Sequence, residues 1–226
     1  MFIYPERALV NRPLPKNKVY ANARPSRSLK QQFVGNVEEI VWKYKLASTT
    51  LRLPASQGIE EIQIFSIALR TAELKEDVLR ALDRAIPSLL FFELNHQRRI
   101  RFAAAYKRMS DAAHDKQFVA AYYLTPWQDA GAPREPLPVA IDMAALYEQM
   151  LYRHMIASGL CLQPRPGETL EGTAERGARI RAQMLACRRL ESRVRREEQF
   201  NRKVEINAEL RQAREILVDL QSGESS

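Results

Sequence analysis

The stretch EEIQIFSIALRTAELKEDVLRALDRAIPSLLFFEL, residues 60–94, predicts a strand, a helix and a second strand in succession. Its first part, EEIQIFSIALR, carries apolar residues on both faces of an extended chain, which predicts a strand in the middle of a sheet. Its second part, AELKEDVLRALDRAI, repeats apolar residues at helical spacing, with Thr71 as the expected N-cap and Pro87 after its end. Its third part, SLLFFEL, predicts a second strand. The positions that carry the two patterns are Ile62, Ile64, Phe65 and Ile67 in the strand and Leu74, Val78, Leu82 and Ile86 in the helix.

Two further strands are expected after this unit. RIRFAAAYKR, residues 99–108, follows a short polar turn at residues 96–98, and KQFVAAYYLTPW, residues 116–127, comes next. Together the segments predict an α+β (mixed α/β) domain built on one sheet of about four strands with flanking helices.

The domain is expected to span residues 26–160. Residues 1–25 contain four prolines and little periodicity, which predicts an extended N-terminal arm. Ser26 or Ser28 should cap a first helix, and a proline-rich loop at 128–138 should lead to a last helix, DMAALYEQMLYRHMIAS. The first helix rests on apolar residues at helical spacing: Leu29, Phe33, Val37, Ile40, Val41 and Tyr44.

A different region follows a linker at residues 161–172. Residues 173–221 contain strong helix formers interrupted only by Gly177, which predicts one long amphipathic helix or coiled-coil extension. Three arrangements stay open: a helix folded back or paired in a hairpin, a coiled-coil contact with another chain, and a DNA-binding helix. Acidic residues between the arginines argue against the third arrangement. The residues expected to bind a protein partner are Leu190, Val194, Phe200, Val204, Leu210, Leu217 and Leu220.

Composition narrows the class of protein. The chain has 226 residues, of which 46% are hydrophobic and 27% charged, a balance typical of globular proteins. No apolar run is long enough to span a membrane and no secretory signal is evident, so a cytoplasmic location is expected. Cys161 and Cys187 lack the spacing of a zinc site, and no cofactor is predicted.

The formal net charge of +8 invites a nucleic-acid interpretation. Basic residues are spread along the chain, and acidic residues interrupt nearly every basic cluster. Tyr122, Tyr123 and Trp127 could stack on bases, although aromatic residues on a strand more often pack a core. The candidate contacts to nucleic acid are Arg98, Arg99, Arg101, Lys107, Arg108, Arg195 and Arg196.

Catalytic candidates are sparse. Glu61, Asp83 and Glu93 lie on or beside predicted strands, as acids of metal-dependent nucleases do, but Asn95 stands where such a site has a lysine. Asp83 and Glu93 are the two retained candidates, and a structural acid is the alternative for each. The histidines His96, His114 and His154 have no partner at a telling spacing, and no metal site is predicted.

Four segments resemble a bacterial family of unknown function: MFIYPERALVNRPLPKNKVY, EEIQIFSIAL, LDRAIPSLLFFEL and AAYYLTPW. The similarity covers roughly residues 1–156, and QFNRKVEINAEL is similar to the C-terminal part of some members. Genes of that family often lie beside DNA methyltransferase and helicase genes of restriction-like anti-phage loci. The resemblance implies a partnership with such enzymes and assigns no catalytic residue.

The sequence is therefore compatible with three functions. The first is a non-enzymatic accessory or scaffolding subunit that docks on a helicase or a DNA methyltransferase of the same locus. The second is a sequence-independent DNA-binding module, and the third is a cryptic metal-dependent nuclease. A protein partner, possible contact with DNA, no membrane and no tight homo-oligomer complete the expectations.

Overall fold

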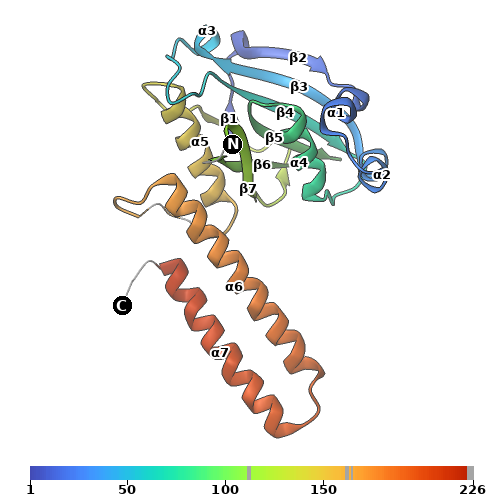
Figure 1. The fold of residues 1–226 in the computed structure, drawn as a ribbon, viewed down its shortest axis with the longest axis vertical. Coiled ribbons are helices and arrows are strands. Elements are labelled where there is room, and N and C mark those ends of the chain that lie inside the picture. The colour runs from blue at the N-terminus through green and yellow to red at the C-terminus, as the bar shows by residue number, and fades with distance from the viewer. Residues whose placement is uncertain (111–112, 161–162, 164, 223–226) are drawn as a thin grey trace. The chain divides into compact units, whose positions relative to one another are not determined.

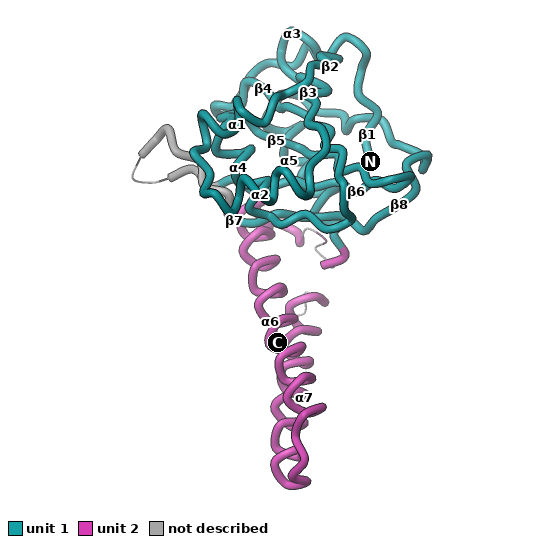
Figure 2. Tube along the Cα trace, turned by 90° about the vertical axis from the view of Figure 1, so that its right-hand side faces the viewer, with its two compact units in different colours: residues 1–158 teal, residues 159–226 magenta. Residues whose placement is uncertain are grey.

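The fold was determined as a computed structural model that describes residues 1–110, 113–160, 163 and 165–222. For residues 108–110 and 113–120 it describes the backbone alone. The chain divides into two compact units, residues 1–158 and residues 159–226 (Figure 2). Among the described helices, none is both long and apolar enough to cross a membrane.

The first unit is built on a seven-stranded mixed sheet (Figure 1). The strand order is β2-β3-β4-β5-β6-β7, and β8 pairs with β6. Among the strand pairs that the structure describes in this sheet, β4–β5 alone is parallel, and α4 connects these two strands. The strands are β2 (Leu9–Pro13), β3 (Val37–Ala47), β4 (Glu61–Leu69), β5 (Leu89–His96), β6 (Arg99–Ser110), β7 (Ala113–Leu124) and β8 (Gln128–Asp129).

Helices cover both faces of this sheet. On one face lie α1 (Lys16–Ala23), α2 (Arg27–Asn36) and α4 (Glu76–Ala85), whose buried residues form one core with β4 and β5. On the other face, α5 (Met143–Ala157) brings Tyr147 and His154 against Phe91 of β5, with ring centroids 6.1 and 4.8 Å apart. The remaining elements of the unit are β1 (Phe2–Ile3), which pairs with β9 (Glu135–Pro136), a short 3-10 helix η1 (Glu6–Ala8) and α3 (Ser48–Leu51).

Residues 60–94 form the strand, helix and strand that the sequence predicts. β4 lies between β3 and β5, as its two apolar faces indicate, and Ile64 stands opposite Phe91 in register. The helix after it begins later than expected, with Lys75 as the N-cap. Thr71 instead donates to the carbonyl of Glu73 at 2.9 Å and accepts from the Asn36 amide.

The mixed α+β class expected from the sequence is confirmed, and three details of the first unit differ from expectation. The sheet has seven strands, because β2 and β3 extend one edge and β8 adds a short pair. The helix expected from Leu29 to Tyr44 ends at Asn36, and the β-branched and aromatic residues after it form β3. The N-terminal arm is not merely extended, since it contains β1, β2 and α1.

The second unit is a helical hairpin. α6 (Leu170–Arg196) and α7 (Phe200–Ser222) are separated by residues 197–199, so the single helix expected over 173–221 is wrong. The hairpin, one of the alternatives left open, is the arrangement found. Cys187 of α6 packs with Leu210 and Ala213 of α7 in a small core of its own.

Candidate functional site

The acidic candidate Glu93 lies in the interior of the first unit. Its carboxylate, 1% exposed, is bracketed by Lys43 Nζ at 2.9 Å and by Arg134 Nη1 at 2.6 Å. Arg134 also donates to the carbonyl of Phe2 at 3.4 Å. The three charges therefore tie the N-terminal strand and the segment before β9 to the central strand β5, which is a structural role.

Asp83 is equally committed to a structural contact. Its Oδ1 lies 2.8 Å from Lys107 Nζ, and both side chains are almost completely buried. The Tyr122 hydroxyl donates to its other oxygen. Burial raises the pKa of Asp83 more than Lys107 and Tyr122 lower it. The pair fixes α4 to β6.

Glu61 completes the set of acids. It accepts from Ser88 Oγ at 2.6 Å and pairs with Lys45 Nζ at 2.5 Å. Glu93 shares the α5 face of the sheet with Phe91, whereas Asp83 reaches the opposite face from α4. No group of three His, Cys, Asp or Glu side chains able to hold a metal ion occurs in the part of the chain that the structure describes.

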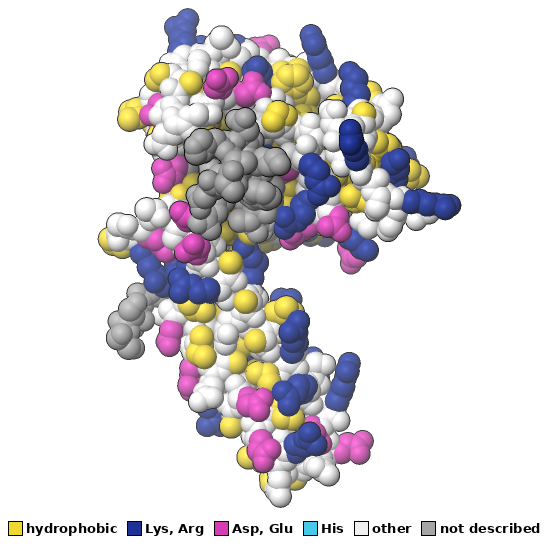
Figure 3. All heavy atoms as spheres, in the orientation of Figure 1, with side chains coloured by type: hydrophobic (Ala, Val, Ile, Leu, Met, Phe, Trp, Pro, Cys, Tyr) yellow, Lys and Arg dark blue, Asp and Glu magenta, His cyan; other side chains and the backbone are white. Residues whose placement is uncertain are grey.

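A basic surface near the N-terminus lies outside the candidates predicted from the sequence. Residues 7–37 contain seven Lys and Arg and no Asp or Glu. Four of these basic residues, on or between α1 and α2, are exposed, and none forms an ion pair within 4.0 Å with another described residue. In Figure 3, basic side chains gather over the part of the first unit that carries α1, α2 and α4. These four residues, called the basic surface below, are Lys18, Arg24, Arg27 and Lys30.

Local sequence explains how this surface is displayed. Pro15 precedes α1, and Arg24 ends it in the left-handed conformation (φ 47°). Ser26 then caps α2 by accepting from the Leu29 amide at 3.2 Å. The apolar sides of both helices enter the core through Val19 and Phe33, which leaves their charged sides to solvent.

A hollow of about 440 Å³ lies at the end of α2. It is lined by Asn36, the loop 72–75, Arg101 of β6 and Trp127. The loop follows the carboxyl end of β4, where it turns into α4. In open α/β sheets, ligands bind beside the carboxyl ends of parallel strands, so the position suits a ligand.

Three charged residues line this hollow, Glu73, Lys75 and Arg101. The Arg101 guanidinium lies 5.3 Å from the Trp127 ring centroid, a cation–π contact, and its buried Nε has no hydrogen-bond partner in the described structure. Partial burial desolvates the guanidinium and lowers the pKa of Arg101. Arg101 is half-buried, and unlike the buried Glu93 and Asp83 it has no opposite charge within 4.0 Å among the described residues. An anion in the hollow would supply one.

The other basic candidates have different positions. Arg98 and Arg99 are exposed at the turn before Arg101, so they can add positive charge near the hollow that Arg101 lines. Lys107 is unavailable to a ligand, because it is buried against Asp83. Arg195 and Arg196 are exposed at the end of α6, in the second unit. The side chain of Arg108 lies outside the described residues.

The aromatic candidates also divide. Tyr122 and Tyr123 are buried core residues, 4% and 0% exposed, so neither can stack on a base. Trp127 is half-buried and lines the hollow. His96 lies near it, with ring centroids 6.4 Å apart, while its Nδ1 contacts the carbonyl of Leu69.

Most residues expected to bind a partner are used by the hairpin itself. Leu210 is buried in the hairpin core, and Leu190, Val194 and Leu217 pack against it. Phe200 and Val204 remain exposed, 78% and 53%. Leu220 is half-buried. The apolar residues of α6, Leu190 and Val194, therefore pack with Leu210 and Leu217 of α7, and residues 197–199 between the helices form the turn.

Comparison with known proteins gives a family and no activity. A family model described as "Domain of unknown function (DUF4391)" matches residues 2–217. None of the curated proteins and none of the solved structures matches the chain. Because the match includes the sheet domain, all of α6 and most of α7, the hairpin is part of the shared domain. The chain belongs to the DUF4391 family, a family of unknown function.

Proposed function

We propose that this chain is a non-enzymatic accessory subunit that binds nucleic acid through its first unit. The observation that carries the proposal is the acid-free stretch of residues 7–37. Its exposed cations lie on or between α1 and α2, and α2 ends at Asn36 in the wall of the hollow that Arg101 and Trp127 also line. Unpaired, solvated cations are free to neutralise phosphates and to release the counterions bound to them.

The two parts of this surface suit different parts of a nucleic acid. The basic surface offers point charges to a phosphate backbone without reading its sequence. Trp127 offers a ring on which an unpaired base can stack, while the desolvated Arg101 guanidinium favours a phosphate. This combination favours a single strand, or a duplex end with an unpaired base, over an intact duplex.

An accessory role agrees with how the acids are used. Glu61, Asp83 and Glu93 are each held in ion pairs that join elements of the fold, and the described acids do not converge on one point. The geometry therefore gives the nuclease alternative no support. The catalytic partner that the resemblance implies is a helicase or a DNA methyltransferase, to which this chain would present its nucleic acid.

The test compares two variants with the same loss of charge. Lys18→Gln/Arg27→Gln/Lys30→Gln changes the basic surface, whereas Arg189→Gln/Arg195→Gln/Arg196→Gln changes exposed arginines of α6. Fluorescence anisotropy with a labelled single strand and its duplex, at roughly 50 and 200 mM salt, measures binding. The first variant should lose at least about tenfold in affinity, and its salt slope should fall by up to about 0.9 for each lost phosphate contact.

The control should keep its affinity within about twofold, because binding rests on location and not on net charge. Equal losses in the two variants would contradict a specific surface. An unmodified chain that does not bind at the lower salt concentration would remove the proposal altogether.

A further inference from the structure

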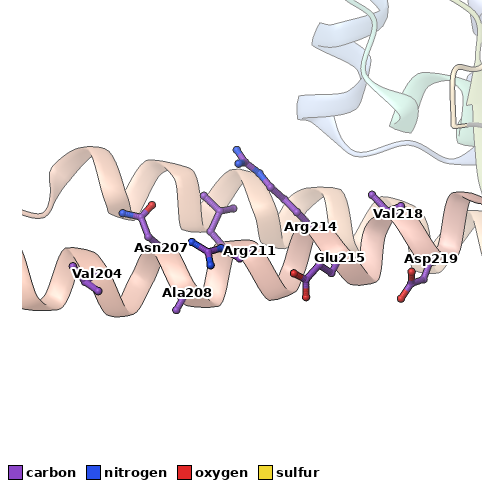
Figure 4. A pocket seen from close by; sticks show the side chains of 9 residues that line it. Val204, Asn207, Ala208, Arg211, Arg214, Glu215, Val218 and Asp219 are labelled. Carbon is purple, nitrogen blue, oxygen red and sulfur yellow. The ribbon is translucent and has the colours of Figure 1, made fainter. Parts of the chain in front are cut away.

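The back of α7, opposite the hairpin core, carries a regular stripe of residues. The core side contains the buried Ile206, Leu210 and Ala213, whereas Val204 and Val218 on the back are 53% and 59% exposed. Figure 4 shows side chains of this face along α7, where they line an open hollow of about 830 Å³. The stripe consists of Val204, Ala208, Arg211, Glu215, Val218 and Ser222.

The spacing of the stripe is that of a coiled-coil seam. Its members follow one another at intervals of four, three, four, three and four residues. This series reads the same in both directions about residue 213. A second copy of α7, turned by a two-fold axis beside that residue, would therefore place every stripe position opposite another stripe position.

The charges agree with this two-fold arrangement. It sets Arg211 against Glu215 of the second copy, and Glu215 against Arg211, so that two reciprocal ion pairs form. Within the chain, neither residue has an ion-pair partner within 4.0 Å in the described structure, although Arg214 one turn away pairs with Glu191. Ala208 then faces Val218, and Asn207 at the edge faces Asp219, both of which line the same hollow.

We infer that α7 is a self-association surface, on which a second copy of this chain docks antiparallel with Arg211 opposite Glu215. Charge complementarity identifies the second copy, in antiparallel orientation, as the partner that fits this surface. A parallel copy in register sets Arg211 against Arg211 and Glu215 against Glu215, which repel. Slipping the antiparallel pair by one heptad sets Arg211 against Ala208 or Ser222 and loses both ion pairs.

The association is weak because the apolar part of the stripe is small. Only Val204, Ala208 and Val218 on each helix contribute apolar surface, far less than a continuous seam of leucines would. Exposed ion pairs add little affinity but discriminate between registers. We therefore expect a monomer–dimer equilibrium that depends on protein concentration.

Charge reversal tests the register directly. Arg211→Glu makes both contacts acid against acid, and Glu215→Arg makes both base against base, so each variant alone should be monomeric. An equimolar mixture of the two restores opposite charges at both contacts and should form a heterodimer. The matched control, Glu205→Arg, changes an exposed acid of α7 outside the stripe and should dimerise like the unmodified chain.

Sedimentation equilibrium of the full chain, free of nucleic acid, measures these states up to roughly 1 mM protein. Circular dichroism checks that each variant keeps its helices, since both positions are exposed. An unmodified chain that stays monomeric over this range overturns the inference and leaves the face to an unlike partner. Dimerisation by either single variant, or a mixture that does not associate, overturns the antiparallel register.

Discussion

At the scale of single residues, His154 links the interior of the first unit to pH. It is 1% exposed, its Nδ1 lies 2.9 Å from the carbonyl of Met150, and the rings of Phe91 and Phe102 surround it. Burial lowers its pKa to about 4. The folded protein therefore keeps this imidazole neutral at a pH where the unfolded chain already binds a proton.

The direction of the pH effect follows from this difference. Since the unfolded histidine titrates near pH 6.5, the stability that neutral His154 contributes is lost as the pH falls from about 6.5 to about 4. Between pH 7.5 and pH 5, the free energy of unfolding should drop by about 2 kcal/mol through this group. Urea unfolding at the two pH values measures the drop. In His154→Leu this decrease in the free energy of unfolding should be smaller by about 2 kcal/mol. In His96→Gln it should equal that of the unmodified chain. An equal decrease in all three proteins would show that His154 is not the group responsible.

Asp83 and Lys107 provide a second prediction at this scale. Removing one charge of a buried pair leaves the other without compensation, so Asp83→Asn should destabilise the protein by about 3–5 kcal/mol. Adding Lys107→Met removes the second charge and should recover most of the loss. Denaturant unfolding measures both values. Glu76→Gln, which breaks the exposed pair with Arg80, should cost less than about 0.5 kcal/mol.

A small effect of Asp83→Asn would show that the pair is not needed for folding. The same reasoning applies to replacement of Asp83 or Glu93 by alanine. Because both carboxylates are buried and held in ion pairs, replacing either one should destabilise the fold even where its role is purely structural. Loss of an activity in such a variant would have to be separated from loss of the fold.

At the scale of secondary structure, the sequence predicts an element when only one periodicity fits. In β4 the apolar residues occupy both faces, and in α4 they fall on one side only, so neither pattern has a competitor. Residues 37–44 fit two patterns. Val37, Ile40, Val41 and Tyr44 satisfy helical spacing, but they are β-branched or aromatic residues, and pairing with β4 decides the conformation.

The hairpin shows a different limit. Two apolar patches separated by a polar segment are visible in the sequence, yet no Gly or Pro marks residues 197–199 as a turn. Whether the patches meet each other or another chain depends on tertiary packing, which spacing alone does not encode. The hairpin core settles the matter by placing Cys187 against Leu210 and Ala213.

This core gives a prediction at the scale of the element. Leu210→Asp places a charge in the contact between α6 and α7 and should cost at least about 2 kcal/mol, enough to separate a two-helix unit. Limited proteolysis should then cut within α7 while the first unit stays folded, and the helical circular dichroism signal should fall. Ile216→Asp, which changes a 51% exposed residue of the same helix, should resist cleavage like the unmodified chain. Equal resistance of both variants would contradict the hairpin core.

For the molecule as a whole, net charge indicates that a partner is acidic but not where on the surface it binds. The value of +8 is compatible with basic residues spread evenly along the chain. The absence of acids from residues 7–37 was the local signal for the basic surface, and it can be read from the sequence alone. The approach of Arg101 to Trp127 could not be read in this way, because the two residues come together only when β6 and the segment after β7 are folded.

The division into two units leads to the last prediction, which concerns a chain that ends at Ser158. Every residue of the core shared by the sheet with α1, α2 and α4 lies before this point, and so do the basic surface, Arg101 and Trp127. We therefore expect the shortened chain to unfold cooperatively and to bind a single-stranded oligonucleotide within about threefold of the full chain. Self-association should disappear, because α7 is gone. Thermal unfolding, anisotropy and sedimentation measure the three properties. A folded fragment that no longer binds would move the nucleic-acid contact to the hairpin, where Arg195 and Arg196 would be the first residues to replace.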